Sequence, residues 1–298
     1  MSLRGYDMRT AELAPAVSVV IPTYMRAASL DRLLSMLESV DRPLGGFEVI
    51  VVDDGSSDRT AEVVSGAAIS VRYVHQENSG PATARNRGWQ LASAPIVVFT
   101  DDDCVPSSSW LVDMAAALDA NPEFAAVGGA IRPLADGFRA RFVQAERLVD
   151  HGADERGVRY LVTANAAVRT VALSAVGGFD ERFPGAAGED TDLGFRLRAA
   201  GYRLGVTGSG LVHHDHRIGW RALFRTYHKH GRARSSLARL HPDAGIGASM
   251  RSMMTPAYWV RRYCMYRRES GRLESLAFVA LRAVCLASYA RGAFSRAR

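Results

Sequence analysis

The stretch Val97–Cys104, VVFTDDDC, joins an apolar run directly to three consecutive aspartates. The run is typical of a buried strand, so the chain delivers three like charges to one point where that strand ends. Adjacent carboxylates repel, and crowding raises the pKa of at least one of them. We therefore expect a divalent cation at Asp101–Asp103, because Mg²⁺ and Mn²⁺ prefer carboxylate oxygens and bridge to phosphates. Taken alone, an acidic turn that caps the helix after Ser107 explains the same residues equally well.

Apolar runs alternate with helical patterns over residues 17–118. The expected strands are Val17–Ile21, Phe47–Val52, Ile69–Val74 and Ile96–Phe99, and the expected helices are Leu30–Val40, Ser57–Val64, Pro81–Leu91 and Trp110–Leu118. Ser29 and Ser57 are the expected N-caps of the first two helices. Short strands that alternate with helices predict βαβ units and a mainly parallel sheet, with helices on its faces.

Three of the expected strands end in polar residues, namely Pro22-Thr23-Tyr24, Asp53-Asp54-Gly55-Ser56 and the three aspartates. The carboxyl ends of parallel strands share one edge of the sheet, and ligands bind there. Arg85 begins the helix that precedes the last of these strands, and its guanidinium fork matches phosphate oxygens. This edge therefore favours a metal-bound diphosphate, although an ordinary Asx turn and a surface arginine are the plainer alternatives for Asp53–Ser56 and Arg85.

The rest of the chain differs in pattern and in charge. Strand patterns occur at Phe124–Ile131 and Tyr160–Val168, and a helix over Thr191–Ala200 is opened by Glu189-Asp190. From Trp220 on, the sequence is mostly helical and basic, so that residues 217–298 carry a net charge of +14 against −8 for residues 1–216. This division predicts an acidic body with a basic, helical C-terminal extension.

Seven segments in this order resemble family 2 glycosyltransferases with the GT-A fold: PTYMR, VIVVDDGSSD, ARNRG, VVFTDDDC, GGFDERF, GEDTDLGFRL and LVHHDHR. The resemblance implies an α/β, Rossmann-like and mainly parallel sheet flanked by helices over residues 15–217. Residues 15–105 would form the nucleotide-binding half, residues 106–217 the acceptor half, and residues 218–298 a helical extension. Residues 1–14 would be a disordered or tag-derived N-terminus. The implied activity is inverting transfer of a sugar from a UDP- or dTDP-sugar to an acceptor hydroxyl.

The resemblance also implies a donor site. The nucleotide-sugar would contact Pro22, Thr23, Arg26, Asp53, Arg85, Asp101, Asp102 and Asn165. Asp53 would bind the base, and Asn165 would line the sugar or acceptor pocket. Met25 stands where Asn is common in the family.

The same resemblance implies a metal site and a catalytic base. Mg²⁺ or Mn²⁺ would be held by Asp103 and Asp101, with His214 as a third ligand ahead of His216 and His213. Glu189-Asp190 matches the ED pair of inverting enzymes, with Asp190 as the general base that deprotonates the acceptor hydroxyl. Taken alone, the histidines read equally well as surface residues, and the acidic pair reads as ordinary acids at a helix N-terminus.

The C-terminal extension, the cysteines and the N-terminal residues suggest which partners the protein has and in which cell compartment it lies. The apolar run Leu276–Leu286 contains Arg282 and is too short to span a bilayer. Packing on the catalytic domain or a homodimer contact is favoured for the extension, with contact to an anionic membrane surface as the alternative. Nucleic acid is not expected, because no recognised module is present. Widely spaced cysteines and an N-terminus without an apolar run favour the cytoplasm, or the inner face of the plasma membrane.

Two other functions compete with transfer of a sugar to a carbohydrate or lipid-linked acceptor. A sugar-nucleotidyltransferase would carry a Gly-rich signature near the first strand, which Pro22–Arg26 lacks. A non-catalytic scaffold that binds nucleotide-sugars would lack the aspartate run or the Glu189-Asp190 pair, and both are present.

Overall fold

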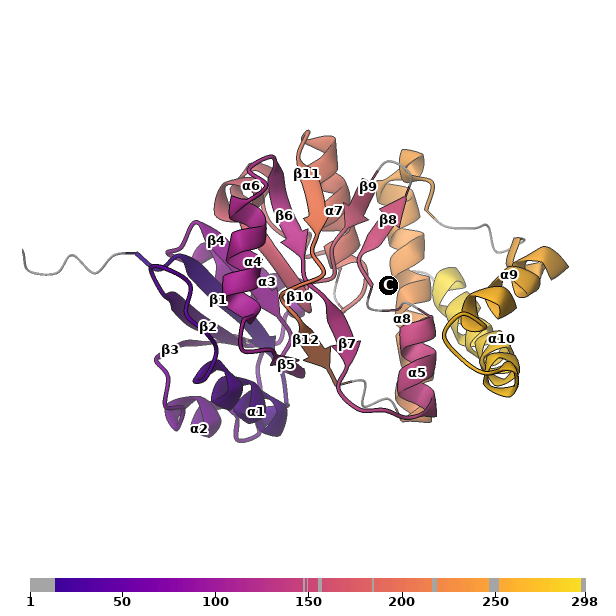
Figure 1. The fold of residues 1–298 in the computed structure, drawn as a ribbon, viewed down its shortest axis with the longest axis horizontal. Helices are drawn as coiled ribbons and strands as arrows, with labels where there is room; N and C mark the ends of the chain where they lie inside the picture. The colour runs from indigo at the N-terminus through magenta and orange to yellow at the C-terminus, as the bar shows by residue number, and fades with distance from the viewer. Residues whose placement is uncertain are drawn as a thin grey trace, which may run out of the picture.

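A seven-stranded, mainly parallel sheet forms the centre of the protein (Figure 1). The computed structural model describes residues 14–146, 148, 150–154, 157–183, 185–215, 219–246 and 252–295. The strands of the sheet are β11 (Arg203–Val206), β6 (Phe124–Gly128), β10 (Asn165–Arg169), β4 (Ile96–Thr100), β1 (Val17–Thr23), β2 (Phe47–Asp53) and β3 (Val71–His75), in that order. All neighbours run parallel except at β10, which is antiparallel to both β4 and β6.

Two small sheets adjoin the central one. The first has the order β5 (Cys104–Pro106), β12 (Val212–His214), β7 (Ile131–Pro133), and the second is a hairpin of β8 (Gly152–Asp154) and β9 (Gly157–Tyr160). In the antiparallel pairing of β12 with β5, His214 lies opposite Cys104. This register brings His214 beside the three aspartates, although 111 positions separate residues 103 and 214 in the sequence.

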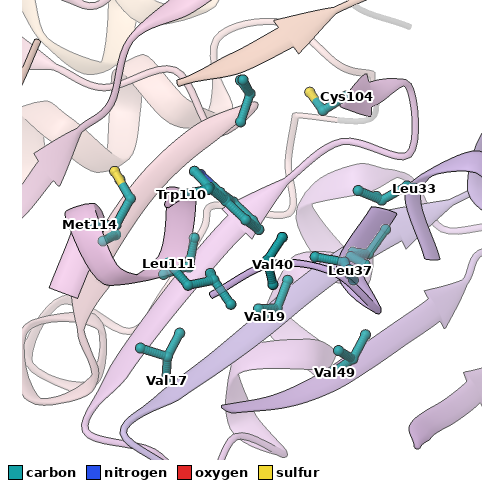
Figure 2. Close-up of a cluster of buried hydrophobic side chains, with 14 of the residues drawn as sticks. Val17, Val19, Leu33, Leu37, Val40, Val49, Cys104, Trp110, Leu111 and Met114 are labelled. Atoms are coloured by element: carbon teal, nitrogen blue, oxygen red, sulfur yellow. The ribbon is translucent and has the colours of Figure 1, made fainter. Parts of the chain in front are cut away.

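Helices cover both faces of the central sheet (Figure 1). One face packs against α1 (Ala27–Leu37), α2 (Thr60–Ser65) and α4 (Trp110–Asp119), and the other against α3 (Pro81–Gln90), α6 (Thr170–Val176) and α7 (Glu189–Ala199). Figure 2 shows the first core, in which Val17 and Val19 of β1 gather with side chains of α1 and α4. Val20, the residue after Val19, enters the second core, as the two-residue period of a strand requires.

The C-terminal helices form a third cluster at one end of the molecule (Figure 1). It contains α5 (Phe138–Ala145), α8 (Trp220–Leu240), α9 (Pro256–Tyr266) and α10 (Arg272–Phe294), with short 3-10 turns at Pro242–Ala244 and Ser252–Met254. Its centre is polar: the Glu146 carboxylate accepts hydrogen bonds from Tyr227, Tyr266 and Arg282. The extension is therefore docked on the body through a buried charge as well as through apolar packing.

Some sequence predictions differ from the structure. The N-cap of α1 is Arg26, and Ser29 is buried inside that helix; the N-cap of α2 is Arg59 rather than Ser57. The expected strand at Phe124–Ile131 divides into β6 and β7. The apolar run Leu276–Leu286 belongs to a 23-residue helix that is long and apolar enough to cross a membrane by length and composition, so the expectation that it is too short was wrong. In the structure this helix packs on α8, with Arg282 buried against Glu146.

Candidate active site

A cleft of about 910 Å³ lies along the carboxyl ends of β1 and β4. Its walls come from the start of α3, the start of α7, the β8–β9 hairpin and one face of α8. Ten of the predicted site residues line it: Pro22, Thr23, Arg26, Arg85, Asp101, Asp102, Asp103, Glu189, Asp190 and His214. These side chains come from β1, α3, α7 and β12 and from the loops after β1 and β4, and the shared sheet edge predicts those at the ends of β1 and β4.

Arg85 links the two acidic groups of the cleft. Its Nη1 donates to Glu189 Oε1 at 2.9 Å, and its Nη2 donates to Asp101 Oδ1 at 2.8 Å. Burial alone would raise the pKa of Asp101, but the charge of Arg85, with His214 and Arg26, outweighs it and holds that pKa below its usual value. Asp101 is therefore ionised and fixed in place by α3.

Asp102 differs from its neighbours because it is almost fully buried. Thr23 Oγ1 donates to Asp102 Oδ2 at 2.8 Å, and Arg26 Nη1 lies 3.2 Å from Oδ1. Burial nevertheless raises the pKa of Asp102 to about 7, and the charge of Asp103 adds to this effect. The crowding of three carboxylates is thus offset only in part by the described cations.

Arg26 reaches the aspartates from a constrained turn. It pairs with both Asp102 and Asp103. Met25, just before it, has a φ of 54°, and its N–H donates to Ser56 Oγ at 2.8 Å. This left-handed conformation suits Asn far better than a bulky side chain, which gives a backbone reason for the Asn that is common here in the resembling family.

Asp103 and His214 form the part of the cleft best suited to a metal ion. Asp103 Oδ1 is buried, has no hydrogen-bond partner among the described residues, and lies 3.4 Å from His214 Nε2. Cys104 is near enough to complete a three-residue cluster, but its Sγ is directed to the Ala164 carbonyl oxygen. Burial also raises the pKa of the Cys104 thiol. The Asp103 carboxylate suits Mn²⁺ or Mg²⁺, whereas the His214 imidazole favours a transition-metal ion over Mg²⁺.

Glu189 and Asp190 open α7 on the opposite wall. Burial, together with the charge of Asp190, raises the pKa of Glu189 to about 7. Burial also raises the pKa of Asp190, against the opposing charge of Arg85. Asp190 Oδ1 accepts the N–H of Thr191 at 2.6 Å, and Asp190 itself remains partly exposed in the cleft. A raised pKa on a partly exposed carboxylate suits a group that accepts a proton.

Asp53 and Asn165 are the two predicted site residues that do not line the cleft. Asp53 is the last residue of β2 and is buried below the turn that follows this strand, where it accepts hydrogen bonds from Ser56 N–H and the Tyr73 hydroxyl. Asp54, next to it, lines the cleft, so base binding by Asp53 stays a prediction.

Asn165 is fully buried. Its Nδ2 donates to the carbonyl oxygens of Ala130 and Gly210, and its Oδ1 accepts from Trp110 Nε1. This differs from the expected pocket-lining position, because the whole amide is used inside the sheet.

The other two histidines of the cluster are placed differently. His213 points to the Pro133 carbonyl oxygen at 3.3 Å, on the other side of β12 from His214. His216 lies outside the described residues.

Sequence reasoning missed one wall of the cleft, which is the inner face of α8. The residues of α8 that line it are Thr226, Lys229, His230, Ala233, Arg234 and Leu237. Their spacing of three and four residues is the signature of one helical face, so the signal was present. In the sequence analysis these residues are instead assigned to a basic extension that begins after residue 217.

Residues 18–174 match the model of the family described as glycosyl transferase family 2. The chain belongs to this family. It is 35% identical over 237 residues to the pre-mycofactocin glycosyltransferase of Mycobacterium tuberculosis (strain H37Rv), covering 76% of this chain and 48% of that relative. It is 35% identical over 230 residues to the validoxylamine A glucosyltransferase of Streptomyces hygroscopicus subsp. jinggangensis, covering 65% and 54%. The chain spans about half the length of these curated relatives.

Solved structures agree on the fold. The mannosyltransferase PcManGT from Pyrobaculum calidifontis, in complex with GDP-Man and Mn²⁺, matches with a TM-score of 0.61 at 22% identity, over 94% of this chain and 80% of that one. TarS 1–349 of S. aureus matches with a TM-score of 0.53 at 18% identity, over 93% and 90%. The predicted family and GT-A fold are thereby confirmed.

Proposed function

We propose that this glycosyltransferase inverts the anomeric centre of a nucleotide-diphosphate sugar and uses Asp190 as the base. One observation carries the proposal: Arg85 donates to Asp101 and to Glu189, and so holds the two acidic groups on facing walls of one cleft. A direct displacement needs the base and the leaving diphosphate on opposite sides of the sugar carbon. No second carboxylate nucleophile is required for this geometry.

The proposed site residues have two separate roles, binding of the donor and deprotonation of the acceptor. On the donor side, Thr23, Arg26 and Arg85 would bind and orient the nucleotide diphosphate, since arginine forks match phosphate oxygens. On the other side, Asp190 would accept the proton of the acceptor hydroxyl as that oxygen attacks the sugar carbon. Glu189 would act as a positioning residue, because its buried carboxylate accepts a hydrogen bond from Arg85 and so holds that guanidinium in place.

A divalent metal fits the Asp103 and His214 side chains, with Asp101 close by. Asp103 Oδ1 offers a buried oxygen with no hydrogen-bond donor among the described residues. When bound, such an ion neutralises charge on the leaving diphosphate. The PcManGT neighbour is described in complex with GDP-Man and Mn²⁺, and TarS in complex with UDP and with UDP-GlcNAc. These descriptions support the class of donor and leave the base and sugar to experiment.

The acceptor would be a carbohydrate or a lipid-linked carbohydrate. Among the similar curated proteins is a glucosyl-dolichyl phosphate glucuronosyltransferase of Haloferax volcanii, 29% identical over 178 residues. That name supports a lipid-linked acceptor as one candidate class for the present enzyme.

Thermal unfolding of the purified chain tests the proposal against UDP-, GDP- and dTDP-sugars, each with and without Mn²⁺. A ligand that binds only the folded protein raises its melting temperature. We expect one nucleotide to do so only with the metal, and Asp103→Ala to abolish the shift, while Asp119→Ala on the exposed end of α4 retains it. No shift for any nucleotide would overturn the donor site. A shift without any sugar transfer or donor hydrolysis would favour a non-catalytic scaffold.

A further inference from the structure

The face of α8 that lines the cleft has an ordered charge pattern. At about 100° per residue, Thr226, Ala233, Leu237 and His230 fall within about 60° of one another at the centre of this face. Lys229 and Arg234 fall at its two edges, about 140° apart. This wall of the cleft thus consists of a row of small, apolar and imidazole side chains, with one cationic side chain at each edge.

The two cations differ in their contacts. Arg234 interacts with the Tyr289 hydroxyl of α10, where its charge opposes the burial that raises the Tyr289 pKa. Lys229 forms no hydrogen bond or ion pair with any residue that the structure describes, and its side chain is exposed. It is also the single lysine among 37 basic residues. An ammonium group in open cleft space is a strongly hydrated point charge that suits an anionic ligand.

The position of α8 sets which ligand its cations meet. Thr226 and His230 border the metal side of the cleft, together with Asp103 and His214. About three turns after His230 the C-terminal end of the helix is tied to α7, since His241 Nε2 lies 2.7 Å from Asp192 Oδ1. Lys229 and Arg234, about 7.5 Å apart along the axis, therefore lie on the wall between the metal side and the helix that carries Asp190.

The donor diphosphate has cations of its own. Arg85 and Arg26 lie among the aspartates, at the carboxyl ends of β1 and β4. The cleft volume of about 910 Å³ is near the top of the range of about 300–1,000 Å³ for ligand pockets. Lys229 and Arg234 on α8 are therefore available to bind a second anionic ligand, the acceptor.

We propose that Lys229 and Arg234 form an anion site for the acceptor, which would carry a phosphate or carboxylate near the hydroxyl that it offers to Asp190. This inference rests on the proposed function. It names the acceptor's chemical class, which the fold and the donor site leave open.

The test uses the full chain saturated with Mn²⁺ and the nucleoside diphosphate that stabilises it. Glucose 6-phosphate, glucuronate, inorganic phosphate and uncharged glucose are then titrated, with binding followed by calorimetry. We expect glucose 6-phosphate or glucuronate to bind and glucose not to bind, and the better of the two identifies the anion. Inorganic phosphate should compete with that ligand, since both would use the same cations.

The variants separate this site from the donor site. Lys229→Gln should weaken binding of the anionic sugar roughly tenfold or more, as loss of a charge-assisted hydrogen bond implies, and Lys229→Arg should restore most of it. Arg232→Gln removes an equal charge from the exposed side of the same helix and should leave binding within about twofold. Nucleoside diphosphate affinity should stay unchanged in all three variants.

Three results would overturn the inference. Binding of no anionic sugar while the nucleoside diphosphate binds would remove the site and leave the proposed function intact. Equal binding of the anionic sugar to Lys229→Gln would remove Lys229 from it. Weaker binding of the nucleoside diphosphate to Lys229→Gln would assign the α8 cations to the donor. Failure of every nucleoside diphosphate to bind would instead remove the proposed function, and the acceptor site with it.

Discussion

The guanidinium of Arg85 lies 2.9 Å from the Glu189 carboxylate, and only 4% of each side chain is exposed. The two residues are 104 positions apart, on α3 and α7. Because the same guanidinium also binds Asp101, the pair fixes the distance between the aspartate run and the predicted base. We therefore expect both stability and catalysis to depend on this pair.

Arg85→Met should destabilise the protein strongly. The substitution removes the cation and leaves Glu189 and Asp101 without it, and loss of one partner of a buried ion pair costs about 3–5 kcal/mol. Urea unfolding measures the change. The matched control is Arg59→Met, which breaks the exposed pair of Arg59 with Glu62 and should leave the unfolding midpoint unchanged. Similar effects from the two variants would contradict a buried linking role for Arg85.

Stability should fall as the pH rises toward neutrality. Burial, with the charge of Asp190, raises the pKa of Glu189 from 4.5 to about 7 in the folded protein. Between these values the folded chain holds a proton that the unfolded chain has released, so the free energy of unfolding decreases with increasing pH. Urea unfolding across this window should show the slope, and Glu189→Gln should reduce it to the part that Asp102 contributes, since burial raises the pKa of Asp102 to about 7 as well. Glu62→Gln, at an exposed site on α2, should not alter the slope; if it does, the assignment to Glu189 fails.

Local sequence pattern was enough to predict the edge of the sheet, but not how the site is closed. The strands that end in Thr23, Asp53 and Thr100 lie side by side, as βαβ alternation requires. The position of α8 was missed, because it depends on long-range contacts with α7 and α10 that no local pattern encodes.

Asn165 shows a second limit of sequence reasoning. An amide at the start of a strand is equally compatible with a ligand contact and with internal hydrogen bonds. In the folded chain, Trp110 and the Gly210 carbonyl oxygen form hydrogen bonds with this amide, so it serves the internal structure.

Removal of Arg26 should strengthen binding of the metal alone. Arg26 pairs with Asp102 and Asp103 and lines the cleft and a second cavity of about 1040 Å³, so a cation that approaches Asp103 competes with it. Arg26→Gln should raise Mn²⁺ affinity several-fold and lower the affinity for the nucleoside diphosphate, which gains from the same guanidinium. Electron paramagnetic resonance of free Mn²⁺ measures the first effect, with Arg59→Gln as the control. Weaker Mn²⁺ binding to Arg26→Gln would show that Arg26 supports the metal.

Asp190→Asn should abolish transfer without loss of donor binding. The amide cannot accept the proton of the acceptor hydroxyl, and loss of a general base costs about 10²–10⁴ in rate. The amide nearly preserves the shape of the side chain, so the melting-temperature shift with donor and Mn²⁺ should persist. In the wild type, the rate should rise with pH through the pKa of Asp190, which burial raises. Transfer by Asp190→Asn within tenfold of the wild type would assign the base elsewhere.

Gly292→Ala should separate α10 from α8 and loosen one wall of the cleft. A methyl group at residue 292 would lie 2.0 Å from the His228 carbonyl oxygen, and one at Gly231 would lie 2.0 Å from that of Tyr289. The helices therefore meet backbone to backbone, and neither carbonyl can move aside without shifting its helix. We expect Gly292→Ala to cost about 1–3 kcal/mol, as overpacked cores do. Gly271→Ala at the N-cap of α10 meets open space and should have no comparable effect on urea unfolding. Equal stability of the two variants would mean that α10 is not packed on α8 in solution.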